Sequence, residues 1–313
     1  MLSIIVPAYN EEENIEKTAS AISGIMEEND IPYELLFVDD GSRDRTFELI
    51  EGLSEENPSI RGLSFSRNFG KEGAIFAGLR HCRGDCAVVI DCDLQHPPEL
   101  MAKMYELWRQ GYKVVEAVKS SRGKESFLYK FFAKCFYGLM EGSSGIKIKG
   151  ASDYKLMDRQ VIDALNELPE RITFYRALSS WVGFKTARLE FDVAPRNAGT
   201  TKWSFKKLFK FALANLTSFT SAPLHIVTAA GILSLIAAAV LGVMQIVRAC
   251  TGTPQNGILP VLLLTGGVIM LALGIIGYYM SKIYEEIKDR PRYIVAHDTL
   301  NKREKTDKTK GAH

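Results

Sequence analysis

Two long stretches without a charged side chain limit what this chain can fold into more than any other feature. They run from Ile226 to Met244 and from Ile258 to Met280. A helix rises about 1.5 Å per residue, so each stretch is long enough to cross a hydrocarbon core of roughly 30 Å. A buried helical hairpin in a large soluble core is the alternative, but two adjacent stretches of this purity favour a pair of transmembrane helices.

Basic residues lie on the outer flanks of the predicted hairpin. They are Lys202, Lys206, Lys207 and Lys210 before it, and Lys282, Lys288, Arg290 and Arg292 after it. The short link from Ala249 to Gly257 is uncharged, and only Arg248 beside it argues for the opposite orientation. Because cytoplasmic flanks are rich in Lys and Arg, we expect the large N-terminal part and both termini to lie in the cytoplasm.

Composition narrows the function only a little. The formal net charge of +2 over 313 residues gives no sign of nucleic-acid binding. The five cysteines form no CxxC pair and no metal-ligand set, which indicates reduced, packed thiols. The apolar run at the N-terminus is too short for a signal peptide, so we expect the first part of the chain to stay in the cytosol.

Alternating strand and helix patterns fill residues 1 to about 115. Strands are predicted for 3–7, 33–38, 60–65 and 86–90, and helices for 12–28, 45–53, 72–80 and 98–110. Alternation of this kind is typical of an α/β fold, in which helices cover both faces of a parallel sheet. The sequence therefore predicts an α/β domain with a mostly parallel sheet ahead of the hairpin.

A cluster of polar residues follows each predicted strand. In chain order the clusters read PAYNEEE, DDGSRD, SRNFGKEG and DCDLQ. In open α/β sheets, ligands collect at the carboxyl ends of the strands. We therefore expect the four clusters to form one polar site.

Acidic side chains dominate that predicted site, and Asp91 and Asp93 stand at the end of its fourth strand. The sequence has neither the GxGxxG turn of dinucleotide-binding proteins nor the GxxxxGK[ST] loop of NTPases. Carboxylates would repel a phosphorylated ligand unless a divalent cation lay between them, and Mg²⁺ or Mn²⁺ prefers carboxylates together with phosphate oxygens. The acidic pair therefore predicts a Mg²⁺ or Mn²⁺ site.

The same segments resemble a known family. SIIVPAYNEEENI, LLFVDDGSRDRT, SFSRNFGKEGAIFAGL and VVIDCDLQHPPE, in this order and spacing, resemble the GT-A fold of family 2 glycosyltransferases. ASDYKLMDR, RNAGTTKWSFKKLFKFAL and the paired apolar stretches resemble the polyprenyl-phosphate glycosyltransferases, which include bacterial bactoprenol glucosyltransferases and dolichyl-phosphate mannose synthase. The resemblance extends over nearly the whole chain, to about Val295.

The resemblance implies a role for each matching residue. Those assigned to the nucleotide sugar are Pro7, Tyr9, Glu11, Asp39, Asp40, Lys71 and Asp91. Asp93 is implied as the main metal ligand, Asp91 as a partner to ribose or metal, and Gln95 as a third ligand. Two roles remain open for Lys71: it could contact a phosphate group, or it could order its loop.

The implied reaction is the inverting transfer of one sugar from a nucleotide diphosphate to a polyprenyl phosphate. A phosphate monoester has a second pKa of about 6, so the acceptor is largely ionised at neutral pH and hardly needs a general base. We therefore expect Asp153 to position a substrate rather than to remove a proton; a helix N-cap is the alternative. Cations for the acceptor phosphate are expected at Arg122, Arg196 and Lys202, unless these only attract anionic lipid.

A basic, aromatic segment precedes the hairpin and predicts an amphipathic helix at the membrane surface. The expected organisation is a GT-A catalytic domain in residues 1–200, this interfacial helix in 201–221, the transmembrane hairpin in 222–282, and a cytosolic juxtamembrane segment with a disordered tail in 283–313. Glycines within the apolar stretches would allow helices to approach closely in a homo-oligomer.

The leading hypothesis is an enzyme of the bacterial cytoplasmic membrane that transfers glucose from UDP-glucose to undecaprenyl phosphate. The sequence leaves UDP-N-acetylglucosamine, GDP-mannose and a modified pentose open as alternative donors. A processive polysaccharide synthase is one alternative, although it would normally carry a QxxRW motif and more spans. A membrane-anchored protein that binds a nucleotide sugar without turnover is the other.

Overall fold

The computed structural model describes residues 1–119, 152–169, 174–191, 222–251 and 258–300. The chain divides into two compact units. The sheet unit comprises Met1–Phe131, Ile146–Lys202 and Arg290–His313, and the hairpin unit comprises Phe132–Gly145 and Trp203–Asp289.

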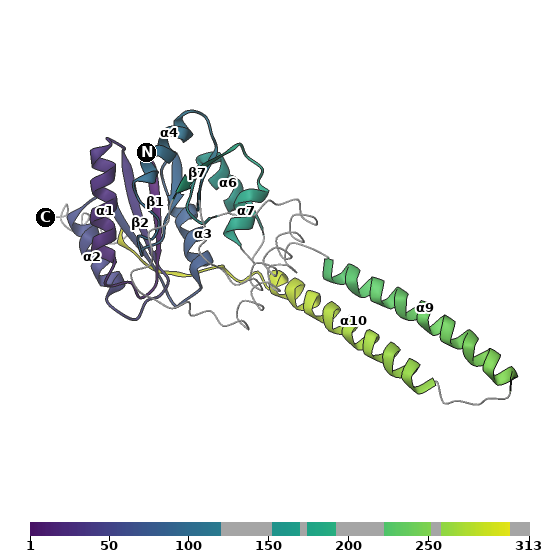
Figure 1. The fold of residues 1–313 in the computed structure, drawn as a ribbon. Helices are drawn as coiled ribbons and strands as arrows, with labels where there is room; N and C mark the ends of the chain where they lie inside the picture. The colour runs from purple at the N-terminus through teal and green to yellow at the C-terminus, as the bar shows by residue number, and fades with distance from the viewer. Residues whose placement is uncertain (120–151, 170–173, 192–221, 252–257, 301–313) are drawn as a thin grey trace. The chain divides into compact units, whose positions relative to one another are not determined.

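A mixed sheet is the centre of the sheet unit (Figure 1). Its strands within the described residues are β1 (Leu2–Ala8), β2 (Tyr33–Asp39), β3 (Ile60–Phe65), β4 (Cys86–Val89), β5 (Val114–Lys119), β6 (Lys155–Asp158), β7 (Thr186–Phe191) and β8 (Val295–Asp298). Their order across the sheet is β7-β5-β6-β4-β1-β2-β3-β8. The pairs β4–β1, β1–β2, β2–β3 and β5–β7 are parallel, whereas β6 and β8 run antiparallel to their neighbours. The predicted mostly parallel sheet is therefore confirmed.

Helices cover both faces of this sheet (Figure 1). They are α1 (Ile15–Glu28), α2 (Thr46–Glu56), α3 (Lys71–His81), α4 (Leu100–Arg109), α6 (Arg159–Glu167) and α7 (Tyr175–Trp181). Apolar residues of α1, α2 and α4 share one core with Ile4 and Phe37. Neighbouring strand residues point to opposite faces, and Ile5 contacts α3 on the other face. A Cβ added at Gly78 would collide with the Ile5 side chain, so a glycine there permits the close approach of α3 to β1.

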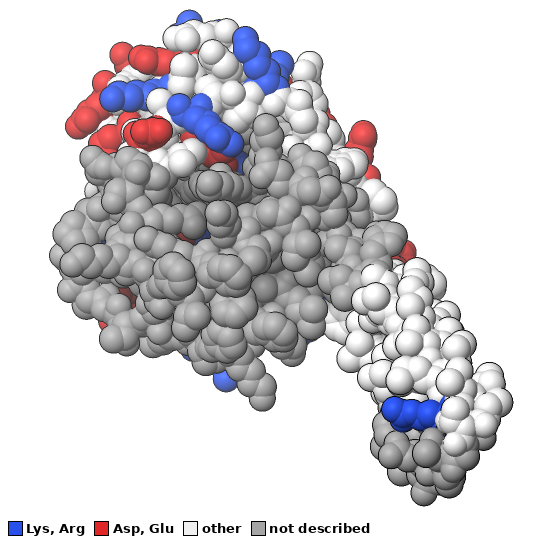
Figure 2. All heavy atoms as spheres, turned by 45° about the vertical axis from the view of Figure 1, so that its right-hand side comes forward, with Lys and Arg blue, Asp and Glu red and all other residues white. Residues whose placement is uncertain are grey.

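The hairpin unit contains α9 (Ala222–Cys250) and α10 (Ile258–Ile287), which pack side by side. Val227–Arg248 and Leu264–Ile287 are long and apolar enough to cross a membrane, with mean hydropathies of 2.3 and 1.6. Neither is buried within the protein, which argues against the alternative of a soluble core hairpin. Figure 2 shows hardly any charged side chains on the visible face of these helices.

Strand β8 differs from the expected organisation of the chain. Residues 283–313 were expected to form a juxtamembrane segment and a tail, but Val295–Asp298 pairs with β3 at the edge of the sheet. Arg61 on β3, whose side chain is 6% exposed, forms an ion pair with Asp298 at 3.9 Å. The buried Thr299 hydroxyl accepts a hydrogen bond from the Gly62 N–H at 3.1 Å. The segment that follows α10 is therefore part of the sheet unit.

Candidate active site

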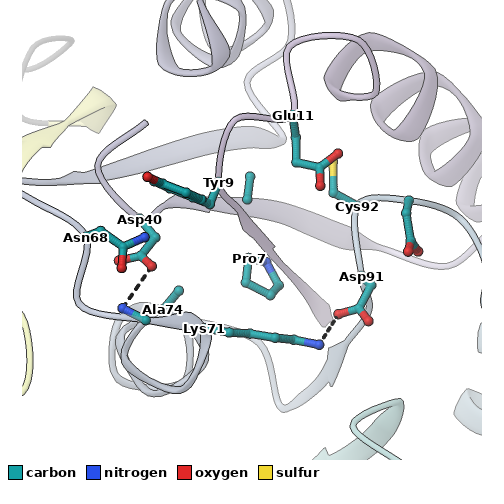
Figure 3. A pocket seen from close by; sticks show the side chains of 12 residues that line it. Pro7, Tyr9, Glu11, Asp40, Asn68, Lys71, Ala74, Asp91 and Cys92 are labelled. Atoms are coloured by element: carbon teal, nitrogen blue, oxygen red, sulfur yellow. Dashed lines mark hydrogen bonds and ion pairs between the residues drawn. The ribbon is translucent and has the colours of Figure 1, made fainter. Parts of the chain in front are cut away.

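A cavity of about 340 Å³ opens at the carboxyl ends of the parallel strands (Figure 3). Residues from the end of β1, the end of β2, the loop between β3 and α3, and the end of β4 line it: Pro7, Ala8, Tyr9, Glu11, Asp40, Asn68, Gly70, Lys71, Ala74, Asp91, Cys92 and Asp93. The four polar clusters of the sequence thus meet at one place, because parallel strands end at the same edge of the sheet.

The acidic pair lies directly beyond β4, and both of its carboxylate residues line the cavity. The ammonium group of Lys71 lies 2.5 Å from Oδ1 of Asp91 (Figure 3). Asp93 Oδ1 accepts a hydrogen bond from the Gln95 backbone N–H at 3.1 Å, across a turn in which Leu94 has a positive φ of 53°. Gln95 itself is not among the described residues that line the cavity.

The donor set suits a metal ion that is shared with a ligand. Asp91 and Asp93 line the cavity together with Glu11 and Asp40, and Mg²⁺ or Mn²⁺ commonly takes one or two carboxylates together with phosphate oxygens. Within the part of the chain that the structure describes, no group of three or more His, Cys, Asp and Glu side chains is arranged to hold a metal ion. The chemistry of the Asp91 and Asp93 carboxylates fits a metal that a phosphorylated ligand helps to bind.

The two neighbouring aspartates after β2 differ in position. Asp39 is 1% exposed and lies behind the cavity lining, where it accepts hydrogen bonds from the Ser42 N–H and the Ser64 hydroxyl at 3.0 and 2.7 Å. Asp40 lines the cavity, and its carboxylate accepts hydrogen bonds from the backbone N–H groups of Phe69 and Gly70 at 2.6 and 2.9 Å. Burial raises the pKa of Asp40, and these two donors oppose that rise. Both aspartates thus hold loops at the cavity.

The residues after β1 form another part of the lining. Tyr9 is 42% exposed, which leaves much of its ring open to solvent or a ligand. Glu11 accepts a hydrogen bond from the Asn14 side chain at 2.6 Å. The Thr18 hydroxyl on α1 donates to the Cys92 carbonyl at 2.7 Å and so ties that helix to the acidic segment. The loops after β1 and β4 are thereby held together.

Asp153 lies next to Lys71 just before β6. Its Oδ2 is 3.1 Å from Lys71 Nζ, so this one ammonium group bridges Asp153 and Asp91. Arg176 on α7 donates from Nε to Asp153 Oδ1 at 2.6 Å and from Nη2 to Oδ2 at 3.0 Å. Burial would raise the pKa of Asp153, but Arg176 and Lys71 outweigh burial and hold it well below its usual range.

Sequence reasoning missed Arg176 and its neighbour in the fold, Glu72. The Glu72 carboxylate accepts a hydrogen bond from the Tyr175 backbone N–H at 2.7 Å, and burial raises its pKa to about 7. A single arginine in a short apolar segment has no spacing signal, because its contact with Asp153 depends on how α7 packs. Glu72 follows Lys71 in the quoted motif, so its position next to the site could have been inferred.

Three predicted site residues, Arg122, Arg196 and Lys202, lie outside the described residues. The predicted interfacial helix in 201–221 also lies outside them. The acceptor phosphate site inferred from the sequence therefore stays a prediction.

Comparison with known proteins gives concordant matches. A family model described as glycosyl transferase family 2 matches residues 3–165. An uncharacterized glycosyltransferase of Bacillus subtilis is 41% identical over 298 residues, covering 94% of this chain and 92% of that protein. A bactoprenol glucosyl transferase of Shigella phage SfV is 37% identical over 302 residues, covering 95% and 98%. Among solved structures, mannosyl-3-phosphoglycerate synthase from Rubrobacter xylanophilus is 16% identical, with a TM-score of 0.48 and coverage of 70% and 72%.

Proposed function

The chain belongs to glycosyl transferase family 2, and from this premise we propose that it transfers one sugar from a nucleotide diphosphate to a polyprenyl phosphate. One observation carries the proposal: a bactoprenol glucosyl transferase matches 95% of this chain at 37% identity. That match extends well beyond the family domain of residues 3–165, so it includes sequence beyond the nucleotide-sugar site. Glucose is the sugar that the name of this relative favours, and we propose UDP-glucose as its donor.

The cavity is suited to the diphosphate of such a donor. Asp91 and Asp93 would hold Mg²⁺ or Mn²⁺, with Gln95 as a proposed further ligand. When bound, the metal would stabilise the negative charge that grows on the leaving diphosphate. Pro7, Tyr9 and Glu11 would contact the nucleotide, while Asp39 and Asp40 would support its site through the loops that they hold.

The proposed transfer is a balanced displacement that inverts the anomeric carbon. An acceptor phosphate oxygen forms the new bond to that carbon, and the bond between the carbon and the donor diphosphate breaks. The electron pair of the broken bond leaves with the nucleoside diphosphate. Because the acceptor phosphate is already largely ionised at neutral pH, the enzyme needs cations and correct orientation more than a proton acceptor.

A lipid acceptor requires a membrane, and the two apolar helices supply the means of reaching one. We propose that α9 and α10 cross the cytoplasmic membrane of a bacterium, with the sheet unit and both termini in the cytoplasm. Arg122, Arg196 and Lys202 would bind the acceptor phosphate near the bilayer. Close packing of the hairpins of two copies would give a homo-oligomer.

Turnover by the full chain in detergent or vesicles tests the proposal. The chain is incubated with undecaprenyl phosphate, Mg²⁺ or Mn²⁺, and each of a panel of radiolabelled nucleotide sugars. We expect label from UDP-glucose in a chloroform-soluble, acid-labile product that disappears without metal or without lipid phosphate. Asp93→Asn is the matched inactive control. Tight donor binding without product from any donor would contradict the proposal and favour a non-catalytic binding protein.

A further inference from the structure

A compact group of charges surrounds Asp153, whose side chain is 11% exposed. Arg176 contacts both carboxylate oxygens, and Lys71 contacts one of them. The side chains of Arg176 and Lys71 are 41% and 43% exposed, so each cation has one part against Asp153 and another part open toward solvent or a ligand. The carboxylate is therefore deeply placed, while its two cations reach outward.

We propose that Arg176 is a positioning residue, which fixes the ionised Asp153 carboxylate against Lys71 so that Asp153 organises cations beside the donor cavity instead of accepting a proton. The inference rests on the proposed transfer of a sugar to a phosphate acceptor. It goes beyond that proposal because it assigns a role to Arg176 and gives a structural reason why Asp153 does not act as a general base.

The first argument is geometric. A two-pronged contact between guanidinium and carboxylate fixes both the distance and the plane of the carboxylate, which a single ammonium contact does not do. With Arg176 at 2.6 and 3.0 Å and Lys71 at 3.1 Å, both oxygens of Asp153 already accept hydrogen bonds. A base must present an oxygen to the proton that it removes, and this carboxylate presents both of its oxygens to cations.

The second argument concerns how α7 is held. At its beginning, the Tyr175 N–H donates to Glu72, which is next to Lys71 on α3. Along the same helix, the ammonium group of Lys155 donates to the Ser179 and Ser180 hydroxyls at 3.0 and 3.4 Å. Lys155 is 1% exposed and forms an ion pair with Glu116 at 3.1 Å. Buried polar contacts thus fix the helix that carries Arg176, as a positioning role requires.

The third argument is the balance of charge around Asp153. The charged and titratable groups that face it are Lys71 and Glu72 from α3, Tyr175 and Arg176 from α7, and Lys155 from β6. Arg176 and Lys71 hold the pKa of Asp153 well below its usual range, against the opposing effect of burial. Loss of Arg176 would leave burial opposed mainly by Lys71, and the pKa of Asp153 would rise.

The pH dependence of turnover tests this inference. The measured quantity is the slope of log(kcat/KM) against pH on the acidic side of the profile. In the wild type we expect a slope of one, because only the acceptor phosphate takes up a proton there. In Arg176→Gln we expect kcat to fall by about 10- to 100-fold, as for loss of a charged hydrogen bond, and the slope to rise toward two because Asp153 also titrates. Arg176→Lys restores a charge and should return the slope to one and recover part of kcat.

A matched control is Arg45→Gln, which removes an arginine from an ion pair outside the contacts that hold α7. Arg45 lies just before α2, its side chain is 71% exposed, and it contacts Glu12 at 3.6 Å. This variant should keep the wild-type slope. A slope of one in Arg176→Gln, or the same slope of two in Arg176→Gln and Arg176→Lys, would overturn the inference.

A second measurement does not depend on turnover. The Asp153 carboxyl carbon of the full chain, labelled with ¹³C-aspartate and assigned with Asp153→Asn, can be followed by NMR as the pH changes. Between about pH 4.5 and 8, a range above the usual pKa of aspartate, the wild-type signal should not show the large shift of a carboxyl group that loses a proton, and the Arg176→Gln signal should show it. The nearby Glu72, whose pKa burial raises to about 7, should move both signals only slightly. A full protonation shift of Asp153 in the wild type would refute the inference. Absence of lipid-linked product from the wild type would instead count against the proposed function, and the NMR titration would still decide the role of Arg176.

Discussion

The contact between Thr299 and Gly62 gives a quantitative test of whether the chain after α10 is part of the sheet unit. Thr299 is 3% exposed, and its hydroxyl accepts the Gly62 N–H at 3.1 Å, one residue beyond the ladder between β3 and β8. Thr299→Val keeps the shape of the side chain but leaves a buried N–H without its acceptor. The expected cost is about 2 kcal/mol, within the range for an unsatisfied buried donor.

That cost should be visible as a change in thermal stability. For a folded unit of roughly 200 residues, each kcal/mol lowers Tm by about 2 to 4 °C, so Thr299→Val should lower Tm by about 4 to 8 °C. The assay is thermal unfolding of the full chain in detergent, followed by a probe of the sheet unit such as nucleotide binding. Thr299→Ser, which keeps the hydroxyl, is the matched control, and its Tm should fall by less than that of Thr299→Val.

The result that would refute this reasoning is equal Tm for Thr299→Val, Thr299→Ser and the wild type. It would mean that the segment after α10 does not hold the edge of the sheet in solution. A truncated chain that ends at Ser221 lacks β8, so it leaves Arg61 without its ion pair to Asp298. If β8 is part of the sheet unit, the truncated chain should be less stable than the full one.

Three further predictions concern the site. Asp93→Asn should greatly reduce turnover with the Tm unchanged, because Asp93 is exposed at the cavity and proposed to bind metal; near-normal rate at saturating Mg²⁺ or Mn²⁺ would contradict the assignment. The folded-state pKa of Glu72 is raised from 4.5 to about 7, so its stabilising contribution is fully present below pH 4.5 and is lost as pH rises through about 7. The Tm should therefore fall over this range in the wild type and fall less in Glu72→Gln. Arg196→Ala should weaken acceptor use more than donor binding, measured as separate KM and Kd values, and equal losses would count against its role.

The sequence predicted the first four strands, β1 to β4, well because their signal is local, whereas it did not predict β5 to β8. Strands β1, β2 and β4 contain the apolar runs IIV, LLFV and CAVV, and β1 and β2 have buried side chains at almost every position, as strands covered on both faces should. Because parallel strands end at the same edge of a sheet, the polar segments that follow them could be predicted to lie together. The family model that matches residues 3–165 confirms the predicted family, and the observed strand order agrees with the predicted GT-A fold.

The features that sequence could not predict depend on contacts between distant segments. Strand β8 is four residues long and pairs with β3 more than 200 positions earlier in the chain. Arg176 reaches Asp153 from α7, a helix that Glu72 and Lys155 contact from other parts of the chain. Such contacts have no periodic pattern, so no local rule identifies them.

The charges of the cavity connect the fold to the chemistry proposed for it. The strand ends bring four carboxylate residues into its lining, Glu11, Asp40, Asp91 and Asp93, against a single lysine among the described lining residues, Lys71. Lys71 is shared by Asp91 and Asp153, so its single positive charge does not balance the four carboxylates of the lining. A nucleotide diphosphate is itself an anion and would be repelled from this lining in the absence of another cation. We therefore expect the proposed donor to need a divalent ion at this site, and it should bind much more weakly in the presence of a chelator than with Mg²⁺ or Mn²⁺.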